Sequence, residues 1–475
     1  MKYIPTIGLE VHCELKTNSK NFSSARNSYT DIPNSNVSPI DMGFPGILPV
    51  VNMEAIRKSI KMALALNCTI PEYLSFERKN YFYPDLPKGY QITQTKNPIG
   101  KNGYVMVNID GEDKKIEILD THLEEDTASL DHYKDYSLLD YNRCGVPLLE
   151  TVTGPCMHSS REAIAFLETL RNIFLYCDIS DARSDRGQIR CDVNISLAPE
   201  GSDKLGTRTE MKNINSFSLV KEAIDAEIKR QEEVLNDGGI INQETRRYDS
   251  ESNTTHLLRT KEDAIDYRYF TEPNIPRIKI SKELVSEIND EIPILQYDRL
   301  MKYTKEYKIN NKDANTLVRD KDLSDYYEEC IKYSVDKIMV SNWLTGDVSA
   351  YLNKNNIGIK ELFLTPEMLV SLINLISDGK ISGHQAKEVL SKSLEEQKDP
   401  ISLVKSMGME QISDKDEIEK IVDKILSDNP NLVNDYKDGK RVFDYMIGLI
   451  MKETRGKVNP KMASLTLKEK LDSLK

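Results

Sequence analysis

The sequence has few cysteines, and none of them form a C-x-x-C pair. The seven cysteines are scattered along the chain and odd in number, which argues against a disulfide framework and against a cysteine-rich zinc site. Also missing is a run of about 18 apolar residues, the length that would span a bilayer. The first residues, MKYIPTIGLEV, lack the charged-then-apolar layout of a signal peptide and the Arg/Ser-rich composition of a transit peptide. These absences predict a cytoplasmic protein in a reducing compartment.

Positive charge is scarce as well. The chain has 64 Lys and Arg against 76 Asp and Glu, a net charge of −12, which argues against a protein that coats nucleic acid non-specifically. Residues 406–436 hold three lysines against eight acids, a net of −5, whereas residues 437–475 hold ten basic residues against five acids, a net of +5. The last segment is therefore the best candidate for a surface that contacts RNA. The alternative is a small helical domain with a solvated basic face.

Several familiar catalytic motifs are absent. The sequence contains no G-x-x-x-x-G-K-[ST] stretch and no protein-kinase motif set, so a site for ATP would be of a different kind. No serine-nucleophile motif or reactive-cysteine signature stands out, and internal repeats and low-complexity tracts are missing too. With 475 residues, 39% hydrophobic and 29% charged, the chain is predicted to be globular and too long for one compact core.

Alternating apolar and polar residues predict strands in the first part of the chain. In residues 7–15 the polar positions are Glu10, His12 and Glu14. In residues 189–197 they are Arg190, Asp192, Asn194 and Ser196. Turn-forming residues then lead to residues 207–214, where Arg208, Glu210 and Lys212 share one face. The last two runs are therefore predicted to form a β-hairpin with a long loop.

Helical patterns over residues 53–67, 159–177 and 219–235 interrupt the strands without a regular βαβ alternation, which predicts an α+β fold. Towards the end of the chain the pattern becomes helical. The helices expected there include residues 295–307, 312–323, 325–334, 336–344 and 366–376. We expect a mixed α/β-sheet domain over residues 1–293, an all-α helical domain over 294–405 and a small helical tail domain over 406–475.

One irregular stretch, Phe76–Gln94, reads FERKNYFYPDLPKGYQITQ. It contains three consecutive aromatic rings. Pro84 and Pro87 fix φ and remove backbone donors, while Gly89 permits a conformation closed to other residues. We interpret the stretch as a shaped, ordered loop of the kind that carries function. The alternative is a proline-stiffened surface connection whose rings lie in the core.

This stretch and the blocks around it resemble the GatB family, which are components of bacterial tRNA-dependent amidotransferases. IGLEVHCEL precedes it, and HLEED, DYNRCGVPLLE, MKNINSF and DYRYF follow in the same order over nearly the whole chain. The resemblance implies a cradle-type catalytic domain, a helical domain and a YqeY-like tail that contacts tRNA.

The resemblance also implies an activity. The chain would belong to a ligase that phosphorylates the side-chain carboxylate of Glu-tRNA(Gln), Asp-tRNA(Asn) or both with Mg-ATP. Ammonia from an amidase subunit, GatA, would then displace the phosphate to form the amide. The three-subunit complex would include a small subunit, GatC, and no membrane.

A magnesium site is implied as well. Adjacent carboxylates repel one another unless a cation offsets them, and clustered oxygen ligands suit a hard divalent ion. Taken one at a time, each such acid is more often a solvated strand residue. The resemblance implies that the residues around the ion, where the ammonia channel opens, are Glu10, His12, Glu124, Glu125 and Glu150. It further implies that Glu125 deprotonates or guides ammonia.

A second polar group is implied to line the site that activates the aminoacyl ester. Phosphoryl transfer needs positive charge over the γ-phosphate and carboxylates or amides on Mg²⁺. The catalytic candidates are Glu10, Lys79, Lys88, Glu125, Arg190, Asp192, Asn194 and Glu210. The candidates for binding ATP are Lys79, Lys88, Arg190, Arg208 and Lys212. Without the resemblance, cross-strand ion pairs would explain Arg208, Glu210 and Lys212 equally well.

Two further stretches bear on ligands. Many members of the family carry a zinc knuckle, C-x-C followed by C-P-x-C, in the segment that matches residues 22–43. Those positions here hold Ser23, Ala25, Ser38 and Asp41. They supply no thiolates, so we expect no zinc.

Residues 247–270 mix aromatic rings with Arg and Lys. Tyr267, Tyr269 and Phe270 are candidates to stack on a base or ribose. Such rings more often lie in the core, which is the interpretation we favour.

Two other function classes fit the residues alone. A self-sufficient ATP-dependent amide ligase that uses free ammonia on a small acid would not need residues 406–475. A non-catalytic scaffold that binds tRNA would tolerate Glu10→Ala and Lys79→Ala without loss of turnover.

Overall fold

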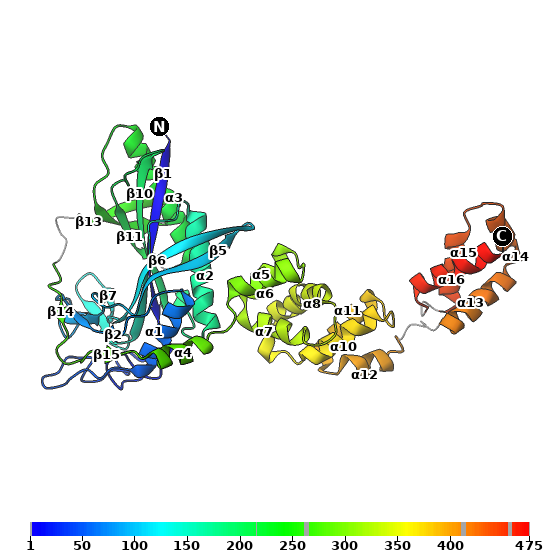
Figure 1. The fold of residues 1–475 in the computed structure, drawn as a ribbon, viewed down its shortest axis with the longest axis horizontal. Coiled ribbons are helices and arrows are strands. Elements are labelled where there is room, and N and C mark those ends of the chain that lie inside the picture. Colours follow the sequence, from blue (N-terminus) through cyan, green and yellow to red (C-terminus); the bar gives the residue numbers. More distant parts are fainter. Residues whose placement is uncertain (1, 215, 261–265, 410–414, 455–457, 475) are drawn as a thin grey trace. The chain divides into compact units, whose positions relative to one another are not determined.

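The computed structural model describes residues 2–214, 216–260, 266–409, 415–454 and 458–474. Part of the aromatic and basic stretch 247–270 therefore lies outside the described residues. The chain divides into two compact units, Met1–Arg299 and Leu300–Lys475 (Figure 1). The first unit is rich in strands and the second is built from helices. The predicted α+β fold with a helical carboxy-terminal region is confirmed.

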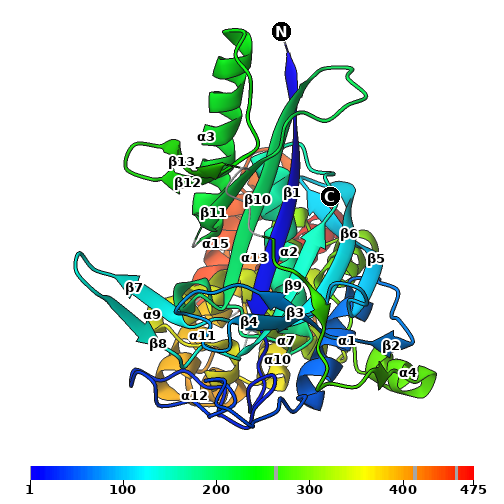
Figure 2. The same ribbon diagram turned by 90° about the vertical axis from the view of Figure 1, so that its left-hand side faces the viewer.

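An eight-stranded sheet organises the first unit, and Figure 2 shows its central strands side by side. The strand order is β13-β12-β11-β10-β1-β9-β6-β5. In chain order these strands are β1 (Tyr3–Glu14), β5 (Gly100–Ile109), β6 (Glu112–Glu125), β9 (Pro147–Thr153), β10 (Ile189–Pro199), β11 (Thr209–Ile214), β12 (Glu244–Asp249) and β13 (Thr254–Thr260). Neighbours pair antiparallel except β11 and β12, which run parallel. The predicted hairpin is confirmed, since Asn194 of β10 lies opposite Glu210 of β11.

Residue alternation decides which face of the sheet is buried. In β1 the fully buried side chains are Ile7, Leu9, Val11 and Cys13. These side chains share one core with three helices, α1 (Met53–Ala65), α2 (Ser160–Tyr176) and α3 (Phe217–Asn236). Each helix begins after a capping residue, Asn52, Ser159 or Ser216, whose side chain accepts from a backbone N–H of the first turn. The polar side chains of β1, which alternate with the buried ones, point to the opposite face.

Short strands frame the irregular loop. The strands β3 (Glu77–Asn80), β4 (Tyr90–Thr93) and β14 (Phe270–Thr271) form a three-stranded sheet. The stretch 76–94 is therefore a loop only over residues 81–89. Its ends are strands because Lys79 lies opposite Gln91 in an antiparallel ladder. Gly89 has a φ of 73°, which glycine adopts without strain.

Three further elements complete the first unit. The strand β2 (Tyr73–Leu74) pairs with β15 (Ile278–Lys279), and β7 (Ser129–His132) pairs with β8 (Ser137–Asp140). A short 3₁₀ turn covers Ser184–Arg186, and α4 (Lys282–Asp290) packs against α1.

The second unit has two hydrophobic cores. Helices α5 (Gln296–Met301), α6 (Asn311–Arg319), α7 (Lys321–Cys330), α8 (Lys337–Trp343), α9 (Ser349–Asn355), α10 (Pro366–Ser377), α11 (Gly383–Glu396) and α12 (Pro400–Ser406) lie in the segment of the first core. Helices α13 (Lys415–Asp428), α14 (Pro430–Lys437), α15 (Phe443–Glu453) and α16 (Pro460–Ser473) surround the second core. Short π-helical turns cover Lys302–Glu306 and Leu344–Val348, and a 3₁₀ turn covers Ile359–Glu361.

One predicted helix boundary is wrong. The pattern predicted a helix over residues 312–323, but α6 ends at Arg319 and α7 begins at Lys321. The break lies at Asp320, whose carboxylate accepts from the backbone N–H groups of Asp322 and Leu323. An aspartate that caps a new helix in this way competes with continuation of the old one.

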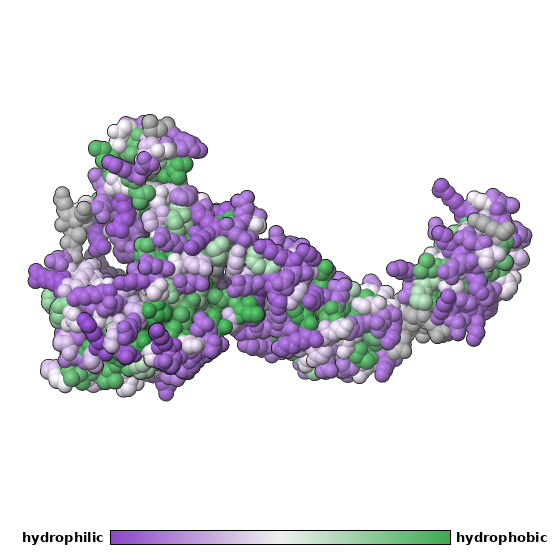
Figure 3. Space-filling model, viewed as in Figure 1, coloured by the Kyte–Doolittle hydropathy of each residue, from purple (hydrophilic) through white to green (hydrophobic). Residues whose placement is uncertain are grey.

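The surface is predominantly polar. In Figure 3 hydrophilic side chains cover most of the visible face, with apolar groups between them. The mean hydropathy of the chain is −0.50. Among the helices that the structure describes, none is long and apolar enough to cross a membrane.

Candidate active site

Three neighbouring strands bring a histidine and two carboxylates together. His12 of β1 lies opposite Glu150 of β9, which lies opposite His122 of β6. The Nε2 atom of His12 is 3.3 Å from Oε2 of Glu150 and 3.8 Å from Oε1 of Glu124. The Nε2 atom of His122 is 3.0 Å from the same Glu150 oxygen. His12, Glu124 and Glu150 thus form a histidine cluster, whose possible ligand atoms lie within 4.8 Å of one another.

Burial and mutual charge shift every group of the histidine cluster. Burial raises the pKa of Glu124, and the charge of Glu150 raises it further. Burial alone would raise the pKa of Glu150 too, but His122 and His12 hold it well below its usual range. Burial would lower the pKa values of both histidines, yet Glu150 raises them. A divalent ion bound here would take the place of the histidine protons as the positive charge.

Glu125 lies in a different environment from Glu124. Its two carboxylate oxygens are 2.5 and 2.6 Å from Nζ of Lys88, and the backbone N–H of Ile92 donates to Oε1 at 2.9 Å. Only 6% of the Lys88 side chain and 2% of the Glu125 side chain are exposed. Burial would lower the pKa of Lys88, but the Glu125 carboxylate raises it. The structure therefore separates Glu125 from the histidine cluster and holds it in a buried ion pair.

Glu10 belongs to a second group, the carboxylate cluster of Glu10, Asp192 and Glu210. Glu10 lies opposite Asp192, and possible ligand oxygens of the three residues lie within 4.8 Å of one another. The Nζ atom of Lys212 is 2.6 Å from Asp192 and 2.9 Å from Glu210. Asn194 Nδ2 donates to Glu10 at 2.8 Å. Burial raises the pKa of Glu10, and the charge of Glu150 adds to this effect.

Arg190 lies apart from these groups. Its Nη2 is 2.8 Å from Oδ2 of Asp126, and Nε of Arg143 is 3.4 Å from the same oxygen. Burial alone would raise the pKa of Asp126, but the two guanidinium groups lower it. Of the predicted polar group, the structure thus brings Asp192, Asn194, Glu210 and Lys212 together, whereas Arg190 is held by a carboxylate that was not predicted.

Two cavities meet at Lys79. One has a volume of about 420 Å³ and is lined by Glu124 and Glu150 of the histidine cluster. The other, of about 1000 Å³, is lined by the aromatic loop, Tyr267 and Lys212, and we call it the aromatic cavity. Lys79 lines both, and its Nζ lies 4.9 Å from the centre of the Tyr267 ring. Burial would lower the pKa of Lys79, but Glu124 raises it.

The exposed rings of the aromatic cavity correct the sequence interpretation. Tyr269 and Phe270 are each 46% exposed, and in the loop Phe82 is 92% and Tyr83 49% exposed. The core interpretation favoured for residues 269 and 270 is wrong, and so is the alternative that buried these two loop rings. The reason is topological, because β14 is an edge strand of the small three-stranded sheet.

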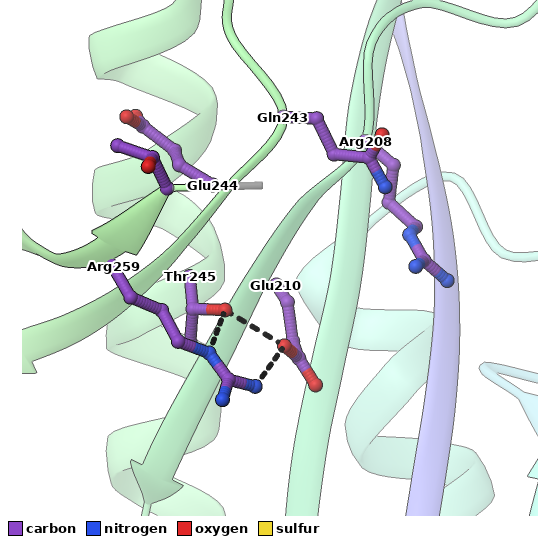
Figure 4. A pocket seen from close by; sticks show the side chains of 7 residues that line it. Arg208, Glu210, Gln243, Glu244, Thr245 and Arg259 are labelled. Atoms are coloured by element: carbon purple, nitrogen blue, oxygen red, sulfur yellow. Dashed lines mark hydrogen bonds and ion pairs between the residues drawn. The ribbon is translucent and has the colours of Figure 1, made fainter. Parts of the chain in front are cut away.

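A third cavity, of about 170 Å³, lies at the edge of the large sheet (Figure 4). Glu210 lines it together with Arg208, which precedes β11, and Thr245 of β12. Arg259 of β13 also lines it, and Figure 4 shows its side chain directed towards Thr245 and Glu210.

Sequence reasoning missed His122, Thr245 and Arg259. His122 had a signal, since it precedes Glu124 by two residues and so shares a strand face with it. Thr245 and Arg259 lie on strands whose places in the sheet depend on the parallel pairing of β11 with β12, which local patterns do not reveal.

A buried ion pair closes the segment in which the zinc knuckle was expected to be missing. The Nζ atom of Lys20 is 3.1 Å from Oδ2 of Asp41, and the two side chains are 0% and 3% exposed. Lys20 also donates to the backbone oxygen of Tyr141 at 3.3 Å, and the N–H of Ser38 donates to Asp41 at 2.9 Å.

Comparison with known proteins covers nearly the whole chain. The family model of the GatB/GatE catalytic domain matches residues 5–286, and that of the GatB domain matches residues 325–471. The GatB component of the aspartyl/glutamyl-tRNA(Asn/Gln) amidotransferase from Oceanobacillus iheyensis is 47% identical over 475 residues, 100% of both chains. Its counterpart from Geobacillus thermodenitrificans is 45% identical over 474 residues, 99% of this chain and 100% of its own. The chain therefore belongs to the GatB family.

Proposed function

We propose that this chain is the subunit of a glutamine-dependent tRNA amidotransferase that carries out the transamidation. It converts Glu-tRNA(Gln), Asp-tRNA(Asn) or both to the corresponding amides for protein synthesis in the cytoplasm. It works in a heterotrimer with the amidase subunit GatA and the small subunit GatC. The observation that carries the proposal is the pair of ionisable clusters, which meet at Glu10 and His12 of one strand. Membership of the GatB family supports the substrate class.

The chemistry requires an activated carboxylate. A side-chain carboxylate is a poor electrophile, so one of its oxygens first attacks the γ-phosphorus of ATP, and the bond to ADP breaks. Ammonia then attacks the carbonyl carbon, the bond to phosphate breaks, and the nitrogen loses a proton. Glu125 is the group we propose to take that proton, with Lys88 holding the carboxylate in place. A shielded path keeps ammonia unprotonated, whereas water at neutral pH would convert most of it to ammonium.

The carboxylate cluster fits a magnesium ion. Its members Glu10, Asp192 and Glu210 offer the hard oxygen ligands that Mg²⁺ prefers. Beside them the Oδ1 atom of Asn194 is buried and has no hydrogen-bond partner among the described residues, so a further acceptor is available. Bound there, Mg²⁺ would offset the charge of the transferring phosphate. The histidine cluster, with one imidazole and two carboxylates, offers a second set of ligands suited to a divalent ion.

The decisive test is conversion of charged tRNA by the assembled complex. Glutamate-charged glutamine tRNA and aspartate-charged asparagine tRNA are each supplied with Mg-ATP, and ammonium chloride replaces glutamine. We expect amide on at least one tRNA, with ADP and phosphate released in equal amounts to it. A complex that binds both tRNAs and forms no amide on either would be a scaffold, and the proposal would fail.

Removing ligands of the carboxylate cluster should weaken divalent binding. We expect Asp192→Asn and Glu210→Gln each to lower the affinity for Mn²⁺ by at least about tenfold, because each removes a charged oxygen ligand. Electron paramagnetic resonance of free Mn²⁺ measures this directly. Asp185→Asn is the matched control, since Asp185 lies in an exposed turn paired with Arg183. Equal affinities in the wild type and all three variants would rule out the carboxylate cluster as the metal site.

The basic tail should matter for tRNA and not for ATP. Residues 415–474 surround their own core, while Met407 and Met409 pack against the preceding one, so a deletion should remove residues 410–475. We expect KM for charged tRNA to rise about tenfold or more, because phosphate contacts dominate such affinities. The KM for ATP should change less than twofold. Unchanged amide formation on tRNA at low substrate concentration would instead support the self-sufficient amide ligase.

A further inference from the structure

A row of cross-strand contacts leads away from the carboxylate cluster. Glu210 of β11 lies opposite Thr245 of β12, which lies opposite Arg259 of β13. Thr245 Oγ1 donates to Glu210 Oε2 at 2.9 Å, and Arg259 Nε donates to Thr245 Oγ1 at 3.2 Å (Figure 4). Arg259 is therefore tied, through one hydroxyl group, to a candidate magnesium ligand.

Arg259 is held less tightly than the other cations of this face. Its Nη2 atom is 3.8 Å from Oε2 of Glu210, which is beyond hydrogen-bond range. By contrast, Lys212 lies 2.6 Å from Asp192 and Lys88 lies 2.5 Å from Glu125. The Arg259 side chain is also 42% exposed. Since a guanidinium group has five N–H donors, its terminal nitrogens can engage an incoming anion.

The position of Arg259 links two cavities. It lines the 170 Å³ cavity together with Glu210, and it lines the aromatic cavity of about 1000 Å³ together with Tyr267 and Phe270. Exposed rings are suited to stack on a base, and the carboxylate cluster is suited to hold the metal of a metal–phosphate complex. A nucleotide that used both features would bring its phosphates to Arg259.

We propose that Arg259 binds the terminal phosphate of the nucleoside triphosphate and leaves Glu210 to do so. Guanidinium and phosphate match in geometry and form strong, charge-assisted hydrogen bonds. Glu210, relieved of the nearby positive charge, then becomes a better ligand for the divalent ion. One side chain thus couples phosphate binding to metal binding. The inference rests on the proposed function, which requires ATP at this site.

The first experiment measures nucleotide affinity. A non-hydrolysable ATP analogue is titrated with Mg²⁺ into the assembled complex by calorimetry. We expect Arg259→Met to weaken binding by about 10- to 100-fold, the loss of one charge-assisted contact, and Arg259→Lys to recover part of it. ADP, which lacks the terminal phosphate, should lose less than threefold. Arg183→Met removes an exposed arginine that pairs with Asp185 and should leave the affinity unchanged.

The second experiment separates this role from a structural one. Without nucleotide, Arg259→Met should bind Mn²⁺ several-fold more tightly than wild type, because a positive charge beside Glu210 has gone. A damaged site would bind both Mn²⁺ and nucleotide more weakly, and that result would overturn the inference.

The remaining outcomes are also distinct. A raised KM for charged tRNA with unchanged affinity for the analogue would assign Arg259 to a tRNA phosphate and overturn the assignment to the nucleotide. Wild type that binds the analogue no better than Arg259→Met would overturn this inference alone. Wild type that binds no nucleotide at all would overturn the proposed function, and the inference with it.

Discussion

Replacing Lys88 by methionine should lower amide formation by about 10²- to 10⁴-fold, the usual contribution of a positioned acid–base group. Lys88 contacts both oxygens of Glu125 in a site that is almost fully buried. A carboxylate buried without a counter-charge takes up a proton or moves, and in either case Glu125 would no longer serve as a base. The rate is measured with ammonium chloride as the nitrogen source, so that ammonia supply from the amidase is bypassed.

The pair should behave as a unit. We expect Glu125→Gln to lose as much activity as Lys88→Met, and the double variant to lose little more than either, because groups that act together are not additive. Glutamine hydrolysis by the amidase subunit serves as the control for assembly and should change less than twofold. If Glu125→Gln lowers the thermal stability while retaining its turnover, the pair is structural, and another group must accept the proton.

Residue alternation predicted the parts of the fold that depend on local sequence. The strand β1 and the β10–β11 hairpin follow from apolar residues at every second position, and Ser159 marks the start of α2 by its capping hydrogen bond. Local patterns failed where partners lie far apart along the chain. The strands β12 and β13 have their places only because β12 runs parallel to β11 across the intervening helix α3.

The candidate site shows the same division. The resemblance assigned Glu124 and Glu125 to one magnesium site, but the structure places them in different environments. Successive residues of a strand point to opposite faces, so the alternation of β6 could already have separated the two. The partner of Glu125 was less accessible to prediction, because the approach of Lys88 depends on how the loop 81–89 folds back between β3 and β4.

The buried pair of Lys20 and Asp41 should be the most sensitive position for stability. Lys20→Met leaves Asp41 without its cation in a site where both side chains are almost fully buried. Breaking such a pair costs about 3–5 kcal/mol, whereas replacing both partners by apolar residues is often neutral. We therefore expect Lys20→Met and Asp41→Leu each to lower the denaturation midpoint of the first unit strongly. The double variant should recover most of the loss, as measured by urea denaturation followed by hydrogen exchange of peptides from residues 17–52.

The effect should extend to the active site, because this segment supports both Lys88 and Glu124. Asn21 Nδ2 donates to the backbone oxygen of Glu124 at 3.0 Å, and a Cβ atom at Gly43, where φ is 64°, would lie 2.9 Å from Cγ of Lys88. Lys20→Met should therefore increase exchange in peptides that contain Lys88 as well as in its own segment. The exposed pair of Lys2 and Glu200 is the control, since Lys2→Met should change neither. Faster exchange confined to residues 17–52 would show that the segment folds independently of the Lys88–Glu125 pair.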